Sequence, residues 1–206
     1  MFLYVLHAWY TYGENYKFIH ILQVWLDGIF MGLPFRTLTA PITTTAKNKK
    51  KGAVTKIYDD AVNQLKITYQ RTLDPKTGLN RHAYDETRKA FWSDNETGLS
   101  QHCWGRAQGW YSMALIEVLD ALPEDYARRS EVIDLLQKDL DAILKWQDKK
   151  TGLWYQVMDS PEREGIATPH SDQRLENYLE STCSSMFTYV LLKAYRKGEV
   201  YGTTTG

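Results

Sequence analysis

The stretch from His102 to Trp110 combines residue types that suit the binding of a polar ligand. Its sequence, His-Cys-Trp-Gly-Arg-Ala-Gln-Gly-Trp, places Arg106 and Gln108 between Trp104 and Trp110. Aromatic rings that alternate with polar groups suit a pocket with flat apolar faces and a few directed hydrogen bonds. Sugars need this combination, because their C–H faces stack on rings while their hydroxyl and carboxylate groups bind donors. The alternative is a helix start that the two tryptophans anchor to the core.

A carboxylate in an apolar segment is the second feature that could do chemistry. Residues 23–33 predict a helix that is apolar on nearly all sides, and Asp27 is its only charged residue. An unpaired carboxylate is costly to bury in its ionised form, so Asp27 is paired, protonated or placed in a polar cavity. The alternative role is a helix cap or a structural hydrogen-bond acceptor. Helical periodicity does not place Asp27 on the face of Trp25, so the two converge only if a helix end lies there.

The remaining polar candidates favour acid/base chemistry on an acidic sugar. His82, Asp85 and Glu86 lie close together in the chain. Arg106 adds a group that holds an anion. Neither the histidines nor the two cysteines have the spacing of a metal site, and no phosphate-binding loop or nucleophilic serine motif is present, so we predict no metal and no cofactor. A conventional glycosidase would pair Asp27 with Asp85 or Glu86, whereas the alternative for these two carboxylates is a helix cap.

Hydrophobic periodicity predicts a chain made of helices. We expect no strand of any length, and helices over residues 23–33, 55–72, 106–121, 123–146 and 178–197. Pro34 ends the first helix, and residues 36–54 form a flexible Thr/Lys-rich connection. Its lysines have no interleaved aromatic residues, so they do not predict a nucleic-acid site. Residues 1–206 are expected to form a single domain.

A short turn motif recurs between the predicted helices. It runs Asp-x-x-Thr-Gly-Leu at residues 74–79, 94–99 and 148–153. In each copy we expect the Asp to cap the backbone, the Gly to take a positive φ and the Leu to return to the core. Polar and aromatic residues follow each turn. Repeated helix–turn units of this kind predict a helical toroid whose loops line one end.

Composition excludes several classes of function. The 25 basic and 25 acidic residues cancel, so no overall charge steers the chain to nucleic acid or to an anionic membrane. No apolar run approaches the length of a membrane span, and residues 1–20 lack the pattern of a secretory signal. The 7 Trp and 14 Tyr fit a protein that binds a carbohydrate such as a small oligosaccharide. Localisation and oligomeric state are not predicted.

Several motifs in their order resemble the unsaturated rhamnogalacturonyl hydrolases and the related unsaturated glucuronyl hydrolases. The motifs are Gln23-Val-Trp-Leu-Asp-Gly28, His82-Ala-Tyr-Asp-Glu86, Trp104-Gly-Arg-Ala-Gln-Gly-Trp110, Leu122-Pro-Glu-Asp125 and Tyr178-Leu-Glu-Ser-Thr-Cys-Ser-Ser-Met-Phe187. The resemblance implies an all-α fold, the (α/α)6 barrel, here incomplete because family members are much longer. It also implies hydration of the 4,5-double bond of an unsaturated uronic acid, after which a hemiketal opens and the glycosidic bond breaks.

The resemblance implies roles for single residues as well. Asp27 matches the family's general acid and base, which protonates the double bond and activates water. An apolar setting walled by tryptophan would raise the pKa of such a carboxyl enough to hold a proton. The other matches are substrate contacts, namely Trp25, His82, Trp104, Arg106, Trp110 and Lys17. Among these Arg106 serves the uronate carboxylate, and the surroundings of Lys17 depart from the family pattern.

The substrate that the resemblance implies is a 4,5-unsaturated galacturonyl-rhamnose oligosaccharide from lyase-degraded pectin. The alternatives are a glucuronyl hydrolase that acts on other polysaccharide fragments and an inactive fragment that binds sugar. The family uses a second acidic residue near the site, in a leading part for which this sequence has no match, so no position is assigned to it. An incomplete toroid is expected to expose apolar helix faces.

Overall fold

The computed structural model describes residues 23–47, 52–160, 166–168, 171–198 and 200. Within these ranges the elements are β1 (Gln23–Trp25), α2 (Leu26–Lys47), α3 (Ala53–Thr72), β2 (Ala83–Asp85), α4 (Gly105–Ala121), α5 (Arg129–Lys145), β3 (Ile166–Thr168), β4 (Ser171–Leu175) and α6 (Ser181–Lys197). The strands form two antiparallel ribbons, β1 with β2 and β3 with β4. The prediction of an all-α chain is confirmed, and the short ribbons add to it.

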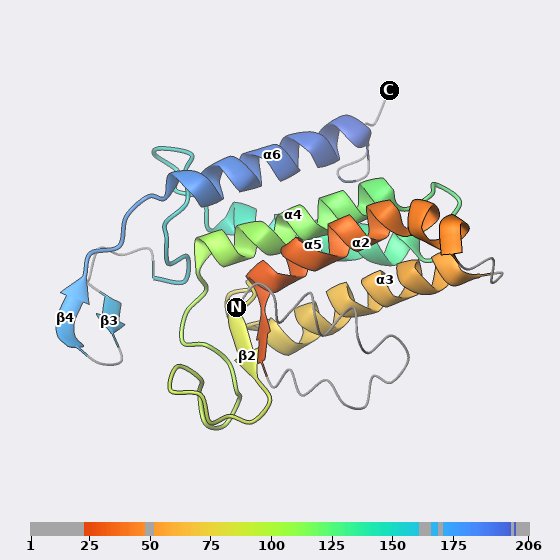
Figure 1. The fold of residues 1–206 in the computed structure, drawn as a ribbon. Coiled ribbons are helices and arrows are strands. Elements are labelled where there is room, and N and C mark those ends of the chain that lie inside the picture. Colours follow the sequence, from red (N-terminus) through yellow and green to blue (C-terminus); the bar gives the residue numbers. More distant parts are fainter. Residues whose placement is uncertain (1–22, 48–51, 161–165, 169–170, 199, 201–206) are drawn as a thin grey trace.

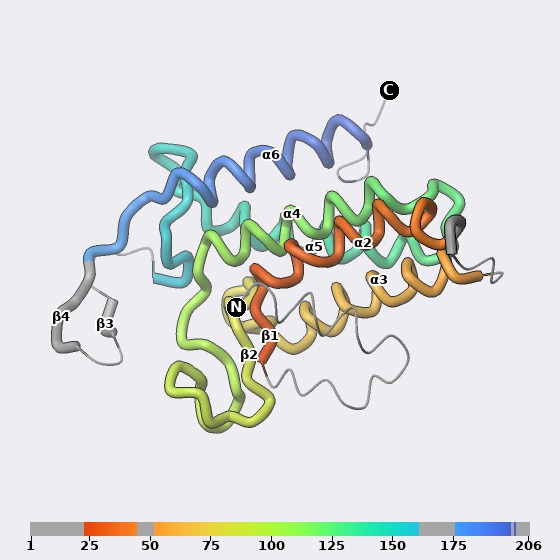
Figure 2. The backbone as a smooth tube through the Cα atoms, in the orientation of Figure 1, coloured from red at the N-terminus to blue at the C-terminus, as the bar shows by residue number. Residues whose placement is uncertain are grey.

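Three helices lie side by side, with α4 between α2 and α6 (Figure 1). Helix α3 packs on α2, α5 packs on α4, and α3 and α5 contact each other, so these two form a second layer. One hydrophobic cluster joins all five described helices. The tube in Figure 2 shows that the segments around β1 and β2 lie at one end of this array, where α2 and α4 begin. None of the helices in the described part of the chain is long and apolar enough to cross a membrane.

Helix α2 is longer than the sequence predicts. A buried stripe with a spacing of three or four residues continues along it, formed by Leu26, Ile29, Leu33, Thr37 and Ala40. Pro34 and Pro41 lie inside the helix but outside this stripe. Four threonines of this helix donate their hydroxyls to backbone carbonyls one turn back, namely Thr37, Thr39, Thr43 and Thr44. The prediction that the helix ends at Pro34 is therefore wrong, and so is the prediction of a flexible connection for residues 36–47, which are helical. Packing of α2 against α4 outweighs the cost of the two prolines.

The two helices at the edges of the three-helix layer expose apolar side chains. On α2, Phe35 and Leu38 are each 66% exposed, and on α6 Leu192 is 65% exposed. Within residues 23–33, which are predicted to be interior on all sides, Trp25 and Met31 are 38% and 37% exposed, so this prediction is wrong for these two side chains. This agrees with the expectation that an incomplete toroid exposes apolar helix faces.

All three copies of the repeated motif form the predicted turn. The glycine N–H of each copy donates at 2.8 Å to the carbonyl of the Asp four residues earlier, and the φ angles of Gly78, Gly98 and Gly152 are 77°, 78° and 73°. Side-chain oxygens of the three Asp residues accept backbone N–H groups within the turns. The expected burial of the leucine is confirmed for Leu79, which is fully buried, and wrong for Leu153, which is 40% exposed beside the exposed face of α6.

The predicted bounds of α3 and α4 hold to within about two residues, whereas α5 and α6 begin later than predicted. Helix α5 starts at Arg129 because the preceding residues form a turn, in which Tyr126 donates to the Pro123 carbonyl at 3.1 Å. Helix α6 starts at Ser181, where the side chain of Glu180 caps the first turn.

Candidate active site

The β1–β2 ribbon positions the first group of candidate residues. Its register pairs Trp25 with Ala83, and Leu26 then donates its backbone N–H to the carbonyl of His82 at 3.1 Å. The chain leaves the strand and enters α2 at this point, so a helix end lies between Trp25 and Asp27, as their convergence requires. The ring centroids of Trp25 and His82 are 5.4 Å apart. The ribbon therefore brings three of the predicted residues to one place.

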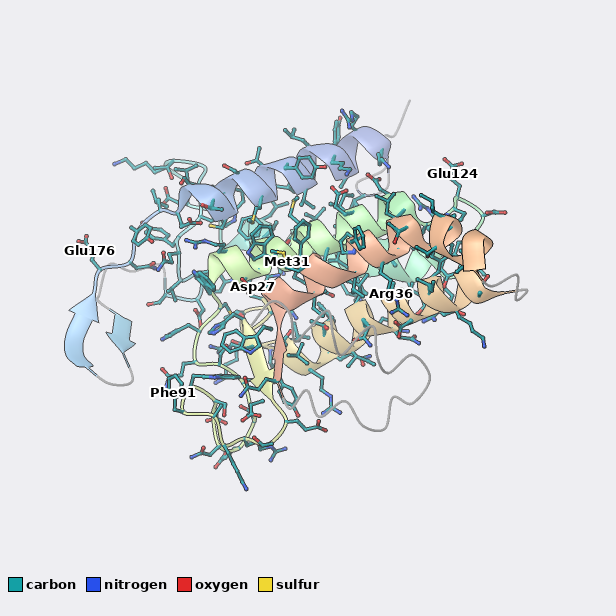
Figure 3. The ribbon with its side chains drawn as sticks, in the orientation of Figure 1. Asp27, Met31, Arg36, Phe91, Glu124 and Glu176 are labelled. Carbon is teal, nitrogen blue, oxygen red and sulfur yellow. The ribbon has the colours of Figure 1, made fainter. Side chains whose placement is uncertain are left out.

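Asp27 lies in the first turn of α2 and is labelled in Figure 3. Its carboxyl is half-buried, and its Oδ2 is one of two buried side-chain atoms in the described residues that have no hydrogen-bond partner. Burial raises the pKa of Asp27, whereas its own backbone N–H, His82 and Arg106 lower it. Burial is the largest of these effects, so the carboxyl holds its proton to a higher pH than an ordinary aspartate does.

The ring of His82 lies among three tryptophans. Its centroid is 5.4 Å from that of Trp25, 6.2 Å from Trp104 and 6.5 Å from Trp92. Its Nδ1 lies 3.4 Å from the backbone oxygen of His102. Burial is the largest effect on this group and lowers the pKa of His82, so the imidazole is neutral at neutral pH. A neutral imidazole in an aromatic wall can form a hydrogen bond with a hydroxyl group of a ligand.

Arg106 brings a cation to the same end of the layer. It lies in the first turn of α4, and its guanidinium lies 5.0 Å over the ring of Trp104. One terminal nitrogen, Nη2, donates to Oε1 of Glu180 at 3.3 Å. The Nε of Arg106 is the second buried atom in the described residues without a hydrogen-bond partner. The two unpartnered atoms thus belong to Asp27 and Arg106, whose charges influence each other.

Trp110 stacks on Phe30, with ring centroids 4.8 Å apart and an interplanar angle of 28°. Trp110 follows Arg106 by one helical turn, and Phe30 follows Asp27 by about one turn. The stack therefore joins α2 to α4 next to the two charged groups. This contact is the one expected of a helix anchor, and because the ring of Trp110 is only half-buried, its predicted contact with substrate stays a prediction.

Comparison with known proteins identifies the family to which this site belongs. A model of glycosyl hydrolase family 88 matches residues 11–204. The chain belongs to this family. A solved structure of a glycoside hydrolase from family 105, from C. acetobutylicum, is 41% identical with a TM-score of 0.72. That match covers 88% of this chain and 45% of the other, so the predicted (α/α)6 barrel fold is confirmed and the chain forms part of such a barrel.

Two curated relatives of this family-88 chain have sequence similarity over most of its length. Protein Atu3128 of Agrobacterium fabrum is 34% identical over 84% of this chain and 64% of its own length. The unsaturated rhamnogalacturonyl hydrolase YesR of Bacillus subtilis is 25% identical over 77% of this chain and 44% of its own length. The chain therefore spans between about half and two thirds of the length of these relatives.

The structure brings most of the predicted site residues of the family-88 chain together. The residues that meet at the start of α2 and α4 are Trp25, Asp27, His82, Trp104 and Arg106. Trp110 lies one helical turn further along α4. Lys17 lies outside the described residues, so its predicted contact with substrate stays a prediction.

Two further side chains contact this group and were not predicted to belong to it. Trp92 packs edge-on against Trp25, with ring centroids 4.9 Å apart, and Glu180 binds Arg106. The sequence contains a signal for Trp92, because the Phe91-Trp92 pair stands among charged residues directly before the second repeated turn. Glu180 stands in the motif from Tyr178 to Phe187, but the sequence does not indicate its contact with Arg106, which joins residues 74 positions apart and depends on the approach of α6 to α4.

Asp85, a suggested partner of Asp27 in a conventional two-carboxylate site, instead binds the backbone of the loop that follows it. The side chain is fully buried and accepts the backbone N–H groups of Thr87, Lys89 and Ala90 at 2.8 to 3.1 Å. Burial raises the pKa of Asp85, but these hydrogen bonds outweigh burial and lower the pKa overall. A carboxylate that is ionised and surrounded by its own donors favours the structural role over the catalytic one. The neighbouring Glu86 is exposed.

A second polar cluster has the composition of a metal site. Asp74, Cys103 and Asp159 bring ligand atoms within 4.8 Å of one another. Arg81 already lies between the two carboxylates, since it pairs with Asp74 at 2.5 Å and with Asp159 at 3.0 Å. Burial raises the pKa of the Cys103 thiol to about 12, which disfavours the thiolate that a metal binds. The cluster is therefore an ion-pair network that ties neighbouring loops together.

Proposed function

We propose that this chain carries the acid/base site of an unsaturated uronyl hydrolase, which releases a 4,5-unsaturated uronic acid from the non-reducing end of an oligosaccharide. The observation that carries the proposal is the pair of unpartnered buried atoms, Asp27 Oδ2 and Arg106 Nε, beside a wall of aromatic rings. Membership in glycosyl hydrolase family 88 supports the same function. Because the chain spans only part of its relatives, the proposal concerns the site that these residues form.

In the proposed reaction Asp27 acts first as an acid. Its protonated carboxyl gives the proton to C4 of the C4–C5 double bond, and positive charge develops at C5 and the ring oxygen. A water molecule adds to C5 and loses a proton to the Asp27 carboxylate, which restores the acid. The hemiketal at C5 opens to a ketone, and C1 then carries a hydroxyl and the leaving sugar. Collapse of C1 to an aldehyde breaks the glycosidic bond, and one water is consumed.

The surroundings of each group suit its step in this reaction. Burial of Asp27 favours the protonated carboxyl that the first step requires. The unpartnered Nε–H of Arg106 is suited to the uronate carboxylate, because charge-assisted hydrogen bonds of guanidinium to carboxylate are strong and directed. The ring of Trp104 offers an apolar surface to the sugar, and the neutral imidazole of His82 offers a hydrogen bond to a hydroxyl.

We infer that the substrate is an unsaturated galacturonyl-rhamnose oligosaccharide from lyase-degraded pectin. The name of the Bacillus subtilis relative, an unsaturated rhamnogalacturonyl hydrolase, supports this choice. The aromatic wall and Arg106 recognise the uronate ring, which galacturonyl and glucuronyl ends share once the double bond has formed. Contacts with the second sugar therefore decide between the two classes of substrate.

The test follows the ultraviolet absorbance of the double bond, which is conjugated with the uronate carboxylate. Unsaturated disaccharides made by a rhamnogalacturonan lyase and by a glycosaminoglycan lyase are each mixed with the purified chain. Loss of absorbance with the first supports the proposal, and loss with the second alone would assign the chain to glucuronyl substrates. No loss with either, from a sample that unfolds cooperatively, would contradict the activity and leave an inactive fragment that binds sugar.

A further inference from the structure

Glu180 lies between α4 and α6, at the end of the layer that holds the candidate site. It is 5% exposed and directly precedes α6. Its Oε2 accepts the backbone N–H of Cys183 at 2.6 Å, and its own backbone N–H donates to the carbonyl of Trp154 at 2.8 Å. The main chain and one carboxylate oxygen of Glu180 are therefore fixed by the backbone.

The second carboxylate oxygen of Glu180 holds Arg106. Oε1 accepts Nη2 at 3.3 Å, and the guanidinium carbon of Arg106 lies over the ring of Trp104, 5.0 Å from its centroid. A hydrogen bond at Nη2 and an aromatic ring beneath the guanidinium restrict the movement of this group. Nε remains without a partner among the described residues. The restraints leave this N–H in a fixed direction, ready for a ligand.

The residue type at position 180 supports a second role beside capping. Ser, Thr, Asn and Asp are the preferred N-cap residues, because their short side chains reach the first-turn N–H groups. Glutamate is one methylene longer than aspartate, and this length lets Glu180 cap α6 and reach Arg106 together. Burial raises the pKa of Glu180, but hydrogen bonds from Cys183 and Thr182 outweigh burial and lower the pKa overall. The group that faces Arg106 is thus an anion.

We propose that Glu180 is a positioning residue, which orients Arg106 so that its Nε–H faces the carboxylate of a uronic acid. This inference rests on the proposed function of the Asp27 site and adds how the chain selects an acidic sugar over a neutral one. Glu180 does not bind the ligand itself, since its two oxygens are used by Cys183 and Arg106. The selectivity comes from the direction of the Arg106 N–H as well as from its charge.

The test uses two variants, Glu180→Ser and Glu180→Asp, whose shorter side chains can still cap α6 but cannot also bind Arg106. Binding of galacturonate and of galactose is measured by tryptophan fluorescence, which reports on the ring that Arg106 covers. We expect wild type to prefer galacturonate, and both variants to bind it about tenfold more weakly while galactose binding stays the same. Glu117→Gln is the matched control, because it removes another α4–α6 ion pair, with Lys193 at 2.7 Å. The control should bind both sugars as wild type does.

A double-mutant cycle with Arg106→Gln separates positioning from a purely structural role. If Glu180 acts through Arg106, Glu180→Ser causes no further loss of galacturonate binding once Arg106 is replaced. An equal loss in both backgrounds, or wild-type selectivity in the Ser and Asp variants, would overturn the proposal. Unfolding of both capping variants would also overturn it, since Glu180 would then serve the stability of α6.

These readouts are independent of turnover. If wild type prefers galacturonate but removes no double bond, the hydrolase activity is contradicted. The double-mutant cycle still tests the positioning role in that case. Wild type that removes the double bond, with unchanged galacturonate selectivity in Glu180→Ser, would contradict the positioning role alone. With an active wild type, the Glu180 variants should raise KM for the unsaturated disaccharide about tenfold and leave kcat nearly unchanged.

Discussion

The backbone N–H of Leu26 donates to the carbonyl oxygen of His82 at 3.1 Å, at the point where β1 ends and α2 begins. Asp27 follows Leu26 directly, so this bond fixes the start of its helix against the strand that carries the imidazole. The two side chains then affect each other's ionisation, since each is among the influences on the pKa of the other. The acid and the neutral ring are therefore brought together by the backbone, independently of any ligand.

The first prediction concerns Asp27. Asp27→Asn removes the proton donor and keeps the shape of the side chain, so turnover of the unsaturated disaccharide should fall by at least about 100-fold. The helical content and the binding of galacturonate should stay near those of wild type, because Oδ2 makes no hydrogen bond to described residues. Absorbance assays and circular dichroism measure the two effects.

Asp85→Asn is the contrasting variant: it should lose activity through disorder of its loop and a lower unfolding temperature. Retained activity in Asp27→Asn would remove Asp27 from the mechanism.

The second prediction concerns the pH dependence of turnover. The first step needs a protonated Asp27, so kcat should be high at low pH and fall as pH rises through the raised pKa of this carboxyl. Arg106 lowers the pKa of Asp27, so Arg106→Gln should move the falling limb to higher pH. Measurements at saturating substrate separate this shift from weaker binding. A falling limb that moves to lower pH in Arg106→Gln would mean that another group is the acid.

The third prediction concerns a buried acid outside the site. Asp139 is buried in α5, where Gln108 and Ser112 donate to it at 2.5 and 2.6 Å, and burial raises its pKa from 3.8 to about 7. The folded state therefore favours the protonated form, so the stability linked to Asp139 is fully present below pH 3.8 and is lost as pH rises through about 7. Urea unfolding should show a smaller loss of stability between about pH 5 and 8 in Asp139→Asn than in wild type. Asp141→Asn, at an exposed position of the same helix, should follow wild type. Parallel curves for wild type and Asp139→Asn would contradict the assignment.

Local patterns in the sequence predicted much of the fold. The spacing of apolar residues gives the helices α3 and α4 almost to their ends, and the repeated Asp-x-x-Thr-Gly-Leu turn gives the positive φ of its glycines. The length of α2 was not predictable in this way, because its prolines break the local pattern of helix-forming residues. The buried stripe that continues past them is recognisable only once α4 packs against it.

In the candidate site, too, local patterns were predictable and contacts between distant segments were not. Trp104 and Arg106 are neighbours in one motif, so their spacing alone indicated a pocket for a polar ligand. The contacts of Trp92 with Trp25 and of Glu180 with Arg106 join distant segments, and no local pattern encodes them. The part of the site that depends on helix packing therefore becomes visible only in three dimensions.

The fourth prediction concerns Trp92. This ring stands edge-on to Trp25, with centroids 4.9 Å apart, and its centroid is 6.5 Å from that of His82. Trp92→Ala removes a surface for sugar stacking and a support for Trp25, so KM for the unsaturated disaccharide should rise about 10-fold with little change in kcat. Tyr195→Ala, at a 60% exposed position near the end of α6, is the aromatic control and should leave KM unchanged. An unchanged KM in Trp92→Ala would place this ring outside the sugar-binding surface.

The fifth prediction explains the two glycines of the Trp-Gly-Arg-Ala-Gln-Gly-Trp motif. A Cβ at Gly105 would lie 2.9 Å from the backbone oxygen of Tyr155 and 3.0 Å from Cys183 Sγ, whereas a Cβ at Gly109 would lie 2.6 Å from Met186 Sδ. The Met186 sulfur is the end of a flexible side chain and can turn away, so that only the milder contact with Met186 Cβ at 3.2 Å remains, whereas the backbone at Tyr155 cannot move as easily. Gly105→Ala should therefore destabilise the chain by about 1–3 kcal/mol. In Gly109→Ala, the gain in helix propensity of roughly 1 kcal/mol offsets most of the strain. Urea unfolding compares the two variants, and equal losses of stability would contradict the difference between the backbone contact and the methionine contact.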